Sequence, residues 1–144
     1  MHTILFLCTG NSCRSQMAEA WARHLKGNQL VPYSAGVNPG VLDQRAVKVM
    51  SEVGIDISNG RPKHVRDLAD VQFDYVVTVC DHAHETCPIF PGQTKVVHHG
   101  FDDPPHLAKS AQSDDDALAI YRRVRDEIRA YIETLPETLT HAAN

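Results

Sequence analysis

The stretch Ile4-Leu5-Phe6-Leu7-Cys8-Thr9-Gly10-Asn11-Ser12-Cys13-Arg14-Ser15 decides the fold. Its apolar start predicts a buried strand over residues 3–7, and the polar residues that follow predict a short loop leading into a helix. Cys8 and Arg14 lie six positions apart across this loop. Backbone N–H groups of such a loop and of a helix N-terminus favour a bound anion. We therefore expect an oxyanion-binding loop that carries its own thiol.

The residue types in this loop suit attack on a phosphate-like centre. Cys8 is the candidate nucleophile, with a pKa that the surrounding N–H groups should lower. Arg14 offers a planar fork of donors to a tetrahedral oxyanion. We expect Asn11 to hold the loop shape and Cys13 to be either a small buried loop residue or an off-pathway trap for Cys8. The predicted oxyanion-binding residues are Thr9, Gly10, Asn11, Ser12, Cys13, Arg14 and Ser15.

Two of these assignments have simpler alternatives. Cys8 could be a buried structural thiol at a strand end, and Ser15 could be a plain helix cap. The Gly10-Asn11 pair, the spacing to Arg14 and the change from strand to helix favour the functional interpretation of Cys8.

Length and composition limit the classes of protein to which this chain can belong. The 144 residues carry a net charge of −4 and predict one domain over residues 1–144. The charge does not suggest nucleic acid or an anionic membrane surface as a partner, and no signal peptide is seen. We expect a cytoplasmic monomer without a bound organic cofactor. In that compartment cysteines stay reduced and are more often catalytic or redox-active than structural.

Apolar periodicity predicts alternating strands and helices. Strands are expected at residues 3–7, 30–35, 75–79 and 95–98, and helices at 15–26, 42–53, 65–69 and 114–135, with a loose tail after Pro136. This alternation predicts a three-layer α/β/α fold with a four-stranded parallel sheet. In such sheets the ligand lies off the carboxyl ends of the strands. The loop after residue 7 and the segments after Val79 and around Asp103 should meet there.

Asp103 stands just before Pro104 near that edge. A carboxyl group here could act as a general acid that protonates a departing oxygen. The alternative is a structural turn, because Asp-Pro commonly opens turns.

Cys80 follows the strongest predicted strand, and Cys87 comes seven residues later. In a regular helix their Cα atoms would lie about 10 Å apart, whereas a disulfide needs less than about 7 Å. Joining them therefore requires the intervening segment to unwind. The alternatives are a structural role or a metal site with His82 and His84. Because the spacing differs from that of common zinc sites, we expect no metal.

The chain resembles the low-molecular-weight protein tyrosine phosphatase fold, and within it the thioredoxin-coupled arsenate reductases. The resemblance extends to about residue 132 and is carried by residues 7–20, Ser34-Ala35-Gly36, residues 53–58, Val77-Thr78-Val79-Cys80, Cys87-Pro88 and Gly100-Phe101-Asp102-Asp103-Pro104. The two extra cysteines, Cys80 and Cys87, separate the reductases from the phosphatases.

The resemblance implies a function and a set of roles. The protein should reduce arsenate to arsenite, with Cys8 as nucleophile, Arg14 holding the oxyanion and Asp103 as general acid. Cys80 should attack the Cys8–arsenic adduct, Cys87 should then attack Cys80, and thioredoxin should reduce the Cys80–Cys87 disulfide. The runner-up is a low-molecular-weight tyrosine phosphatase. Against it, Pro104-Pro105-His106 stands where such phosphatases often carry paired aromatic residues.

Some relatives also carry a potassium site beside the loop. The matching residues here are Asn11, Glu19 and Ser34, but the acidic ligand expected after Gly60 is replaced by the basic run Arg61, Lys63, His64 and Arg66. We therefore expect no potassium ion here, with the ammonium group of Lys63 in place of the cation.

Overall fold

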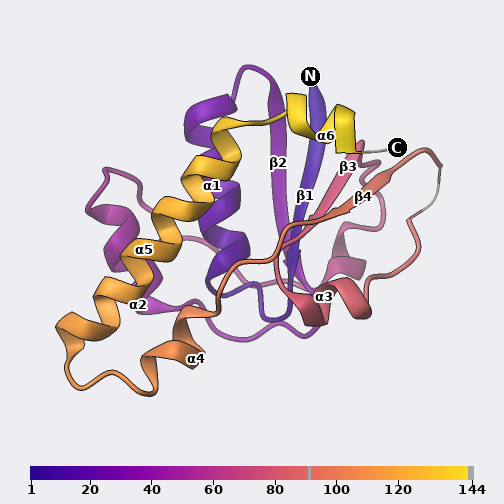
Figure 1. The fold of residues 1–144 in the computed structure, drawn as a ribbon. Coiled ribbons are helices and arrows are strands. Elements are labelled where there is room, and N and C mark those ends of the chain that lie inside the picture. Colours follow the sequence, from indigo (N-terminus) through magenta and orange to yellow (C-terminus); the bar gives the residue numbers. More distant parts are fainter. Residues whose placement is uncertain (91, 143–144) are drawn as a thin grey trace.

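Cys8 stands at the end of the central strand of a parallel sheet. In the computed structural model, which describes residues 1–90 and 92–142, four strands form this sheet in the order β2-β1-β3-β4 (Figure 1). Their bounds are β1 His2–Cys8, β2 Leu30–Gly36, β3 Tyr75–Thr78 and β4 Lys95–His98. Each neighbouring pair is parallel, which confirms the predicted sheet.

Helices cover both faces of the sheet. Their bounds are α1 Arg14–Lys26, α2 Gln44–Ser51, the 3₁₀ helix η1 Val65–Leu68, α3 Asp81–Glu85, α4 Pro104–Ala108, α5 Asp114–Glu133 and α6 Glu137–Ala142. Helix α1 packs against β1, β2 and α5, and α2 packs against α5. The shorter η1 and α3 lie on the other side of the sheet (Figure 1). The α/β/α layering is confirmed, with one layer thinner than the other.

The core explains why these segments fold as they do. Ile4, Leu5, Phe6 and Leu7 are all fully buried, as expected for a central parallel strand covered on both faces. Helix α5 buries a regular apolar stripe, and its N-terminus is capped by Ser113, whose hydroxyl accepts from the Asp116 amide at 3.0 Å. Such a cap typically contributes about 1 kcal/mol to helix stability.

Several predicted bounds differ from the structure. The tail after Pro136 is not loose, because residues 137–142 form α6; residues 143 and 144 lie outside the described residues. Leu139 is fully buried, and this apolar anchor orders the segment. The short helix α4 was not predicted, and α2 is two residues shorter at each end than expected. Among the described residues, no helix is long and apolar enough to cross a membrane.

The carboxyl ends of the strands bring the site segments together. The loop after β1 leads into α1, and Cys80 begins the segment after β3. The segment after β4 stays beside β3, because the Phe101 amide donates to the Val79 carbonyl at 3.0 Å. The predicted convergence at this edge is confirmed.

Candidate active site

The loop after β1 is held by hydrogen bonds from the segment that follows β2. The carbonyl groups of Cys8, Thr9, Gly10 and Ser12 accept from the amides of Val37, Asn38, Gly40 and Asp43 at 2.8–3.1 Å. These bonds turn the loop carbonyls outward. The first internal bond of α1 runs from the Met17 amide to the Cys13 carbonyl, so the amides of residues 14–16 precede it. This geometry leaves loop and helix N–H groups for an anion.

Gly36 makes the close approach of these two segments feasible. A Cβ atom at this position would lie 2.5 Å from the Thr9 carbonyl oxygen and 3.0 Å from the Asn11 nitrogen. Such distances leave no room for a side chain. Gly36 therefore serves as the backbone support of the anion loop, a role that the sequence pattern alone did not reveal.

Asn11 fixes the curvature of the loop, as predicted. Its φ of 52° places it in the left-handed region, which asparagine tolerates better than most residues. Its side chain is fully buried and donates to Ser15 Oγ at 2.8 Å. Its Oδ1 accepts from the Gln16 side chain at 3.3 Å and from the Lys63 amide at 3.1 Å. The loop conformation is thus held by α1 and by the segment around residue 63.

Arg14 is oriented toward the mouth of the loop. Its side chain is 11% exposed, donates to the Phe101 carbonyl at 2.9 Å, and lies 3.7 Å from the Asp103 carboxylate. A guanidinium fixed in this way keeps other donors available for an oxyanion. The structure therefore brings Arg14 and Asp103 together, as the sequence predicted.

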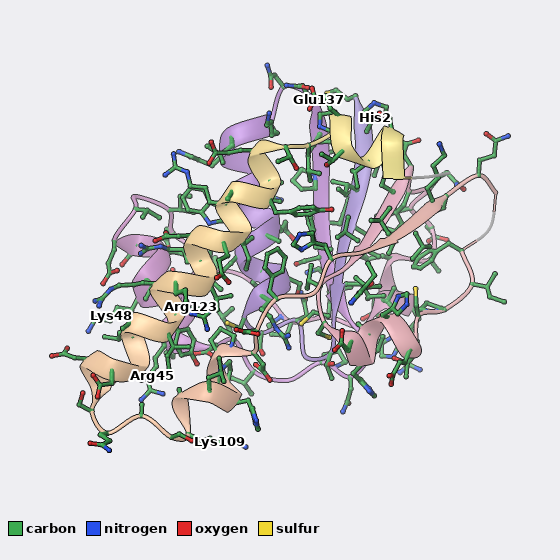
Figure 2. All side chains as sticks on the ribbon, viewed as in Figure 1. His2, Arg45, Lys48, Lys109, Arg123 and Glu137 are labelled. Carbon is green, nitrogen blue, oxygen red and sulfur yellow. The ribbon has the colours of Figure 1, made fainter. Side chains whose placement is uncertain are left out.

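The neighbouring carboxylates Asp102 and Asp103 have different partners. Asp102 accepts from Arg123, which projects from α5 (Figure 2), at 3.1 Å. Asp103 precedes α4 with no side-chain cap bond, and Pro104 occupies the first turn. The Asp103 carboxylate, which is 46% exposed, therefore faces Arg14 rather than its own helix. This placement favours the general-acid interpretation over a purely structural turn.

Cys8 and Cys80 interact directly at the centre of the site. Their hydrogen bond raises the pKa of Cys8, which burial raises further, while Arg14 and Ser15 lower it. The same bond lowers the pKa of Cys80 to about 5, with help from Thr9, the Ala83 amide and Arg14. Two groups that share a proton titrate as a pair. One thiolate charge is therefore present near neutral pH.

The sequence placed the lowered pKa on Cys8, and the structure corrects this. The pKa of the more deeply buried Cys8 is raised and that of Cys80 is lowered, because the Cys8 thiol keeps its proton and stabilises the charged form of Cys80. Sequence reasoning considered the loop alone. It could not include the sulfur atom of Cys80, which comes from the segment after β3.

Cys80 and Cys87 lie at the two ends of α3. Cys80 caps the helix, with its Sγ accepting from the Ala83 amide at 3.4 Å and lying 3.3 Å from Thr9 Oγ1. Cys87 is half-buried, and burial raises its pKa. All four cysteines of the chain lie within the described residues and are free thiols. A Cys80–Cys87 bond would therefore require rearrangement of the helical segment between them.

A pocket of about 420 Å³ opens at this edge of the sheet. Its lining residues are Arg14, Asp81, Gly100, Phe101, Asp102 and Asp103. Arg14 is the residue by which this pocket borders the anion loop. Paired aromatic residues that would grip a substrate ring are not among these lining residues.

A second support of the loop was missed in the sequence. The Tyr121 hydroxyl on α5 donates to Asp43 Oδ2 at 2.6 Å, and the Asp43 amide donates to the Ser12 carbonyl at 2.9 Å. In the sequence, Tyr121 falls on the apolar stripe of α5, so its position predicts burial and not a hydrogen bond to the loop. Its hydroxyl nevertheless couples α5 to the loop through Asp43.

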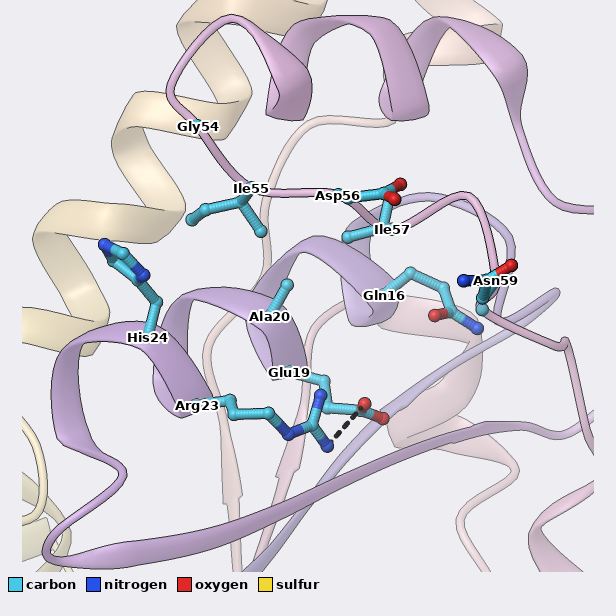
Figure 3. Close-up of a pocket in the computed structure, with 11 residues that line it drawn as sticks. Gln16, Glu19, Ala20, Arg23, His24, Gly54, Ile55, Asp56, Ile57 and Asn59 are labelled. Carbon is cyan, nitrogen blue, oxygen red and sulfur yellow. Dashed lines mark ion pairs between the residues drawn. The ribbon is translucent and has the colours of Figure 1, made fainter.

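The region that matches the potassium site of some relatives is arranged differently from the prediction. Glu19 accepts from Ser34 Oγ at 2.7 Å and pairs with Arg23 at 2.9 Å (Figure 3). The ammonium group of Lys63 donates to the Arg61 carbonyl at 3.1 Å. The expectation that this ammonium replaces a cation is therefore wrong, because only the main-chain amide of Lys63 reaches Asn11.

Glu19 and Arg23 also line a pocket of about 650 Å³ between α1 and residues 54–60 (Figure 3). This pocket does not contain any of the cysteines. Within the described part of the chain, no group of three or more His, Cys, Asp or Glu side chains could hold a metal ion. The imidazole of His84, considered above as a ligand, instead packs on His98 with ring centroids 4.4 Å apart.

Comparison with known proteins agrees with this geometry. The arsenate reductase of Halalkalibacterium halodurans is 47% identical over 135 residues, which cover 94% of this chain and 95% of that protein. A solved arsenate reductase in its oxidised state superposes with a TM-score of 0.77 at 28% identity, covering 94% of this chain and 96% of that one. Another, in its phosphate-binding state, gives 0.74 at 28% identity with the same coverage.

The family assignment follows from a match over nearly the whole sequence. The family model of the low molecular weight phosphotyrosine protein phosphatases matches residues 3–144. The anion loop, Arg14 and Asp103 stand together in the structure as the sequence resemblance implied. The chain belongs to the low molecular weight phosphotyrosine protein phosphatase family.

Proposed function

We propose that this protein reduces arsenate to arsenite through Cys8, Cys80 and Cys87, with electrons from thioredoxin. The observation that carries the proposal is the position of Cys80: its sulfur lies 3.3 Å from the hydroxyl of Thr9, the residue after Cys8 in the anion loop, and it starts the segment that ends in Cys87. A phosphatase ends its cycle with water and needs only the first of these thiols. The similarity to curated arsenate reductases points the same way.

The first step is formation of a sulfur–arsenic bond. Arsenate enters the loop and is held by backbone amides and Arg14. The proton shared between Cys8 and Cys80 moves onto Cys80, so Cys8 becomes the thiolate. Cys8 attacks arsenic, and an oxygen departs as water with a proton from Asp103. Arsenic remains As(V) in this adduct.

The second step transfers two electrons to arsenic. Cys80 gives its proton to an oxygen on arsenic, and the resulting thiolate attacks the Cys8 sulfur. The electron pair of the sulfur–arsenic bond passes to arsenic, which leaves as arsenite, As(III). A Cys8–Cys80 disulfide remains, so two thiols have been oxidised and one arsenic centre reduced.

The third step moves the disulfide away from the loop. The Cys87 thiolate attacks the Cys80 sulfur, Cys8 leaves as a thiolate, and a Cys80–Cys87 disulfide forms. Burial raises the pKa of Cys87 in the reduced fold, so exposure of this thiol as α3 rearranges favours its thiolate form. Thioredoxin then reduces the new disulfide by thiol–disulfide exchange. This sequence accounts for both extra cysteines and for the helix between them.

A coupled assay tests the proposal. Thioredoxin, thioredoxin reductase and NADPH are mixed with the protein and arsenate, and NADPH consumption is followed. We expect arsenate-dependent turnover that is lost in Cys80→Ser and on omission of thioredoxin. Hydrolysis of p-nitrophenyl phosphate by both forms, without arsenate-dependent NADPH consumption, would instead identify a phosphatase.

A further inference from the structure

His98 is the residue of β4 that contacts α3, the helix between the two redox cysteines. Its Nε2 lies 3.0 Å from Asp81 Oδ1, and its ring stacks on His84 with centroids 4.4 Å apart. Asp81 and His84 are the first and fourth residues of the five-residue α3. One side chain therefore contacts a large part of this helix from a neighbouring strand.

The His98 ring is itself held from the sheet. Its Nδ1 lies 2.8 Å from the hydroxyl of Thr78, which is fully buried in β3. Since Asp81 carries only acceptor oxygens when ionised, Nε2 donates to Asp81 and Nδ1 accepts from Thr78. The resulting chain from Thr78 through His98 to Asp81 joins β3, β4 and α3. It ends one residue after Cys80.

The backbone of Gly100 lies beside this pair, whose His98 side chain is 27% exposed and whose Asp81 side chain is 89% exposed. A Cβ atom on Gly100 would lie 3.3 Å from His98 Nε2 and 3.5 Å from Asp81 Oδ1. A short helix of this kind has little intrinsic stability and depends on tertiary contacts. Two other anchors are the fully buried Ala83 and the contact of Thr9 Oγ1 with Cys80 Sγ at the N-cap. Its remaining bonds are local, from the Ala83 amide to Cys80 Sγ and from Thr86 Oγ1 to the His82 carbonyl.

We infer that His98 is a positioning residue of the cysteine relay: it holds α3 against the sheet with Cys80 beside Cys8, and it must release α3 before Cys87 can reach Cys80. The inference rests on the relay proposed above. In the first two steps the contact keeps Cys80 at the loop. In the third it opposes the rearrangement that forms the Cys80–Cys87 bond, so it sets the balance between the dithiol and disulfide forms.

Amide hydrogen exchange of the reduced protein tests the holding role without any redox chemistry. The reporting amides are those of Ala83, His84 and Thr86, which bond to Cys80 Sγ, the Cys80 carbonyl and the His82 carbonyl. In His98→Ala their exchange should quicken by about three- to tenfold, the effect of one or two modest contacts. Amides of β1 should not change, which would exclude general destabilisation.

Three further variants make the measurement specific. His98→Gln keeps a donor near the position of Nε2 and should restore most of the protection. Asp81→Ala removes the same bond from an exposed side chain, so it should fold and should also quicken exchange. His99→Ala is the matched control, because His99 packs on Phe101 and Tyr131 rather than on α3, and it should leave the three amides unchanged.

The disulfide equilibrium tests the consequence for the relay. In a Cys8→Ser background, glutathione buffers set the oxidation of Cys80 and Cys87: oxidised glutathione accepts two electrons and two protons as its own bond breaks and the protein bond forms. His98→Ala should favour the disulfide by about three- to tenfold over the parent, with His98→Gln near the parent and His99→Ala equal to it.

The two readouts separate the possible failures. Unchanged exchange of the three amides in His98→Ala would overturn the inference, whatever the relay does. Faster exchange with an unchanged disulfide equilibrium would overturn the claim that His98 sets the redox balance. If no Cys80–Cys87 disulfide forms in any variant, the proposed relay fails, and faster exchange would then establish His98 as a structural contact of α3 only.

Discussion

The Thr9 hydroxyl lies 3.3 Å from the sulfur of Cys80. Thr9 belongs to the anion loop after β1, and Cys80 begins the segment after β3, so this contact joins the oxyanion site to the redox segment. It also brings a hydroxyl donor to the sulfur that carries the thiolate charge, and it lowers the pKa of Cys80. The ionisation of the cysteine pair and the geometry of the loop are therefore linked.

The shared ionisation of Cys8 and Cys80 should be visible in the pH dependence of cysteine alkylation. Because the pKa of Cys80 is lowered to about 5, the reduced protein should already carry one thiolate at pH 7. The rate of alkylation of Cys80 by iodoacetamide should rise with pH through about 5 and then level off, whereas that of Cys87, whose pKa is raised, should still rise toward pH 9. Stopped-flow or quenched alkylation between pH 4 and pH 9, with mapping of the modified cysteine, gives the profile.

Thr9→Val is the matched variant for this profile. Removing the hydroxyl donor destabilises the thiolate, so the midpoint should move to higher pH. A parent profile of Cys80 that keeps rising toward pH 9 without a plateau would contradict the lowered pKa. An unchanged midpoint in Thr9→Val would contradict the role of the hydroxyl.

Arg14→Lys should impair turnover although it preserves the charge. Lysine has no planar fork for two oxyanion oxygens and cannot reproduce the bond to the Phe101 carbonyl in the same geometry. We expect kcat/KM for arsenate to fall by about 10²- to 10³-fold, together with weaker inhibition by phosphate. Arg123→Lys, at an exposed ion pair on α5, is the control. Equal activity of the two variants would be inconsistent with a role for Arg14 in holding the oxyanion.

Asp103→Asn should slow the chemical step, because an amide cannot protonate the departing oxygen. General acid catalysis typically contributes about 10²- to 10⁴-fold, and we expect a loss of kcat in that range. Asp102→Asn should cost far less, since that carboxylate pairs with Arg123. Pre-steady-state measurement of arsenate-dependent thiol loss compares them. A larger loss of kcat in Asp102→Asn than in Asp103→Asn would contradict the general-acid role of Asp103 and give that role to Asp102.

Gly36→Ala should disturb the anion loop from outside it. The added Cβ atom would meet the Thr9 carbonyl at 2.5 Å, whereas at Gly40 it would meet nothing within 4 Å. Overpacking of this kind typically costs about 1–3 kcal/mol. We expect Gly36→Ala to lower the free energy of unfolding by that amount and to weaken phosphate binding. Urea denaturation and phosphate titration measure both, and Gly40→Ala should match the parent in each.

Much of the fold could be predicted, because the strongest signals were local. The apolar run Ile4–Leu7 and the β-forming run before Cys80 gave the central strands, and the anion loop followed from residue types at fixed spacing. Asp103 could be placed near Arg14 because parallel strands present their carboxyl ends at one edge. These predictions rest on periodicity and topology, which a single sequence carries.

The rest depended on contacts between distant residues. Leu139 orders α6 by packing into the core. The short, mostly polar tail around it has no pattern that predicts this burial. The pKa of Cys80 is lowered because its sulfur meets Cys8 and Thr9 across 71 or more positions of sequence. Lys63 was expected to contribute its ammonium group, whereas it contributes a backbone amide. In each case the orientation of the side chain is set by its packing and not by its residue type.

The Cys87→Ser variant tests the central claim most directly. Cys87 is needed only in the third step, so this variant should release one equivalent of arsenite and then stop with Cys8 and Cys80 joined. Rapid mixing with one equivalent of arsenate, acid quench and peptide mapping by mass spectrometry would reveal the Cys8–Cys80 disulfide. Sustained turnover of Cys87→Ser with thioredoxin alone, or arsenite release without that disulfide, would contradict the three-cysteine relay.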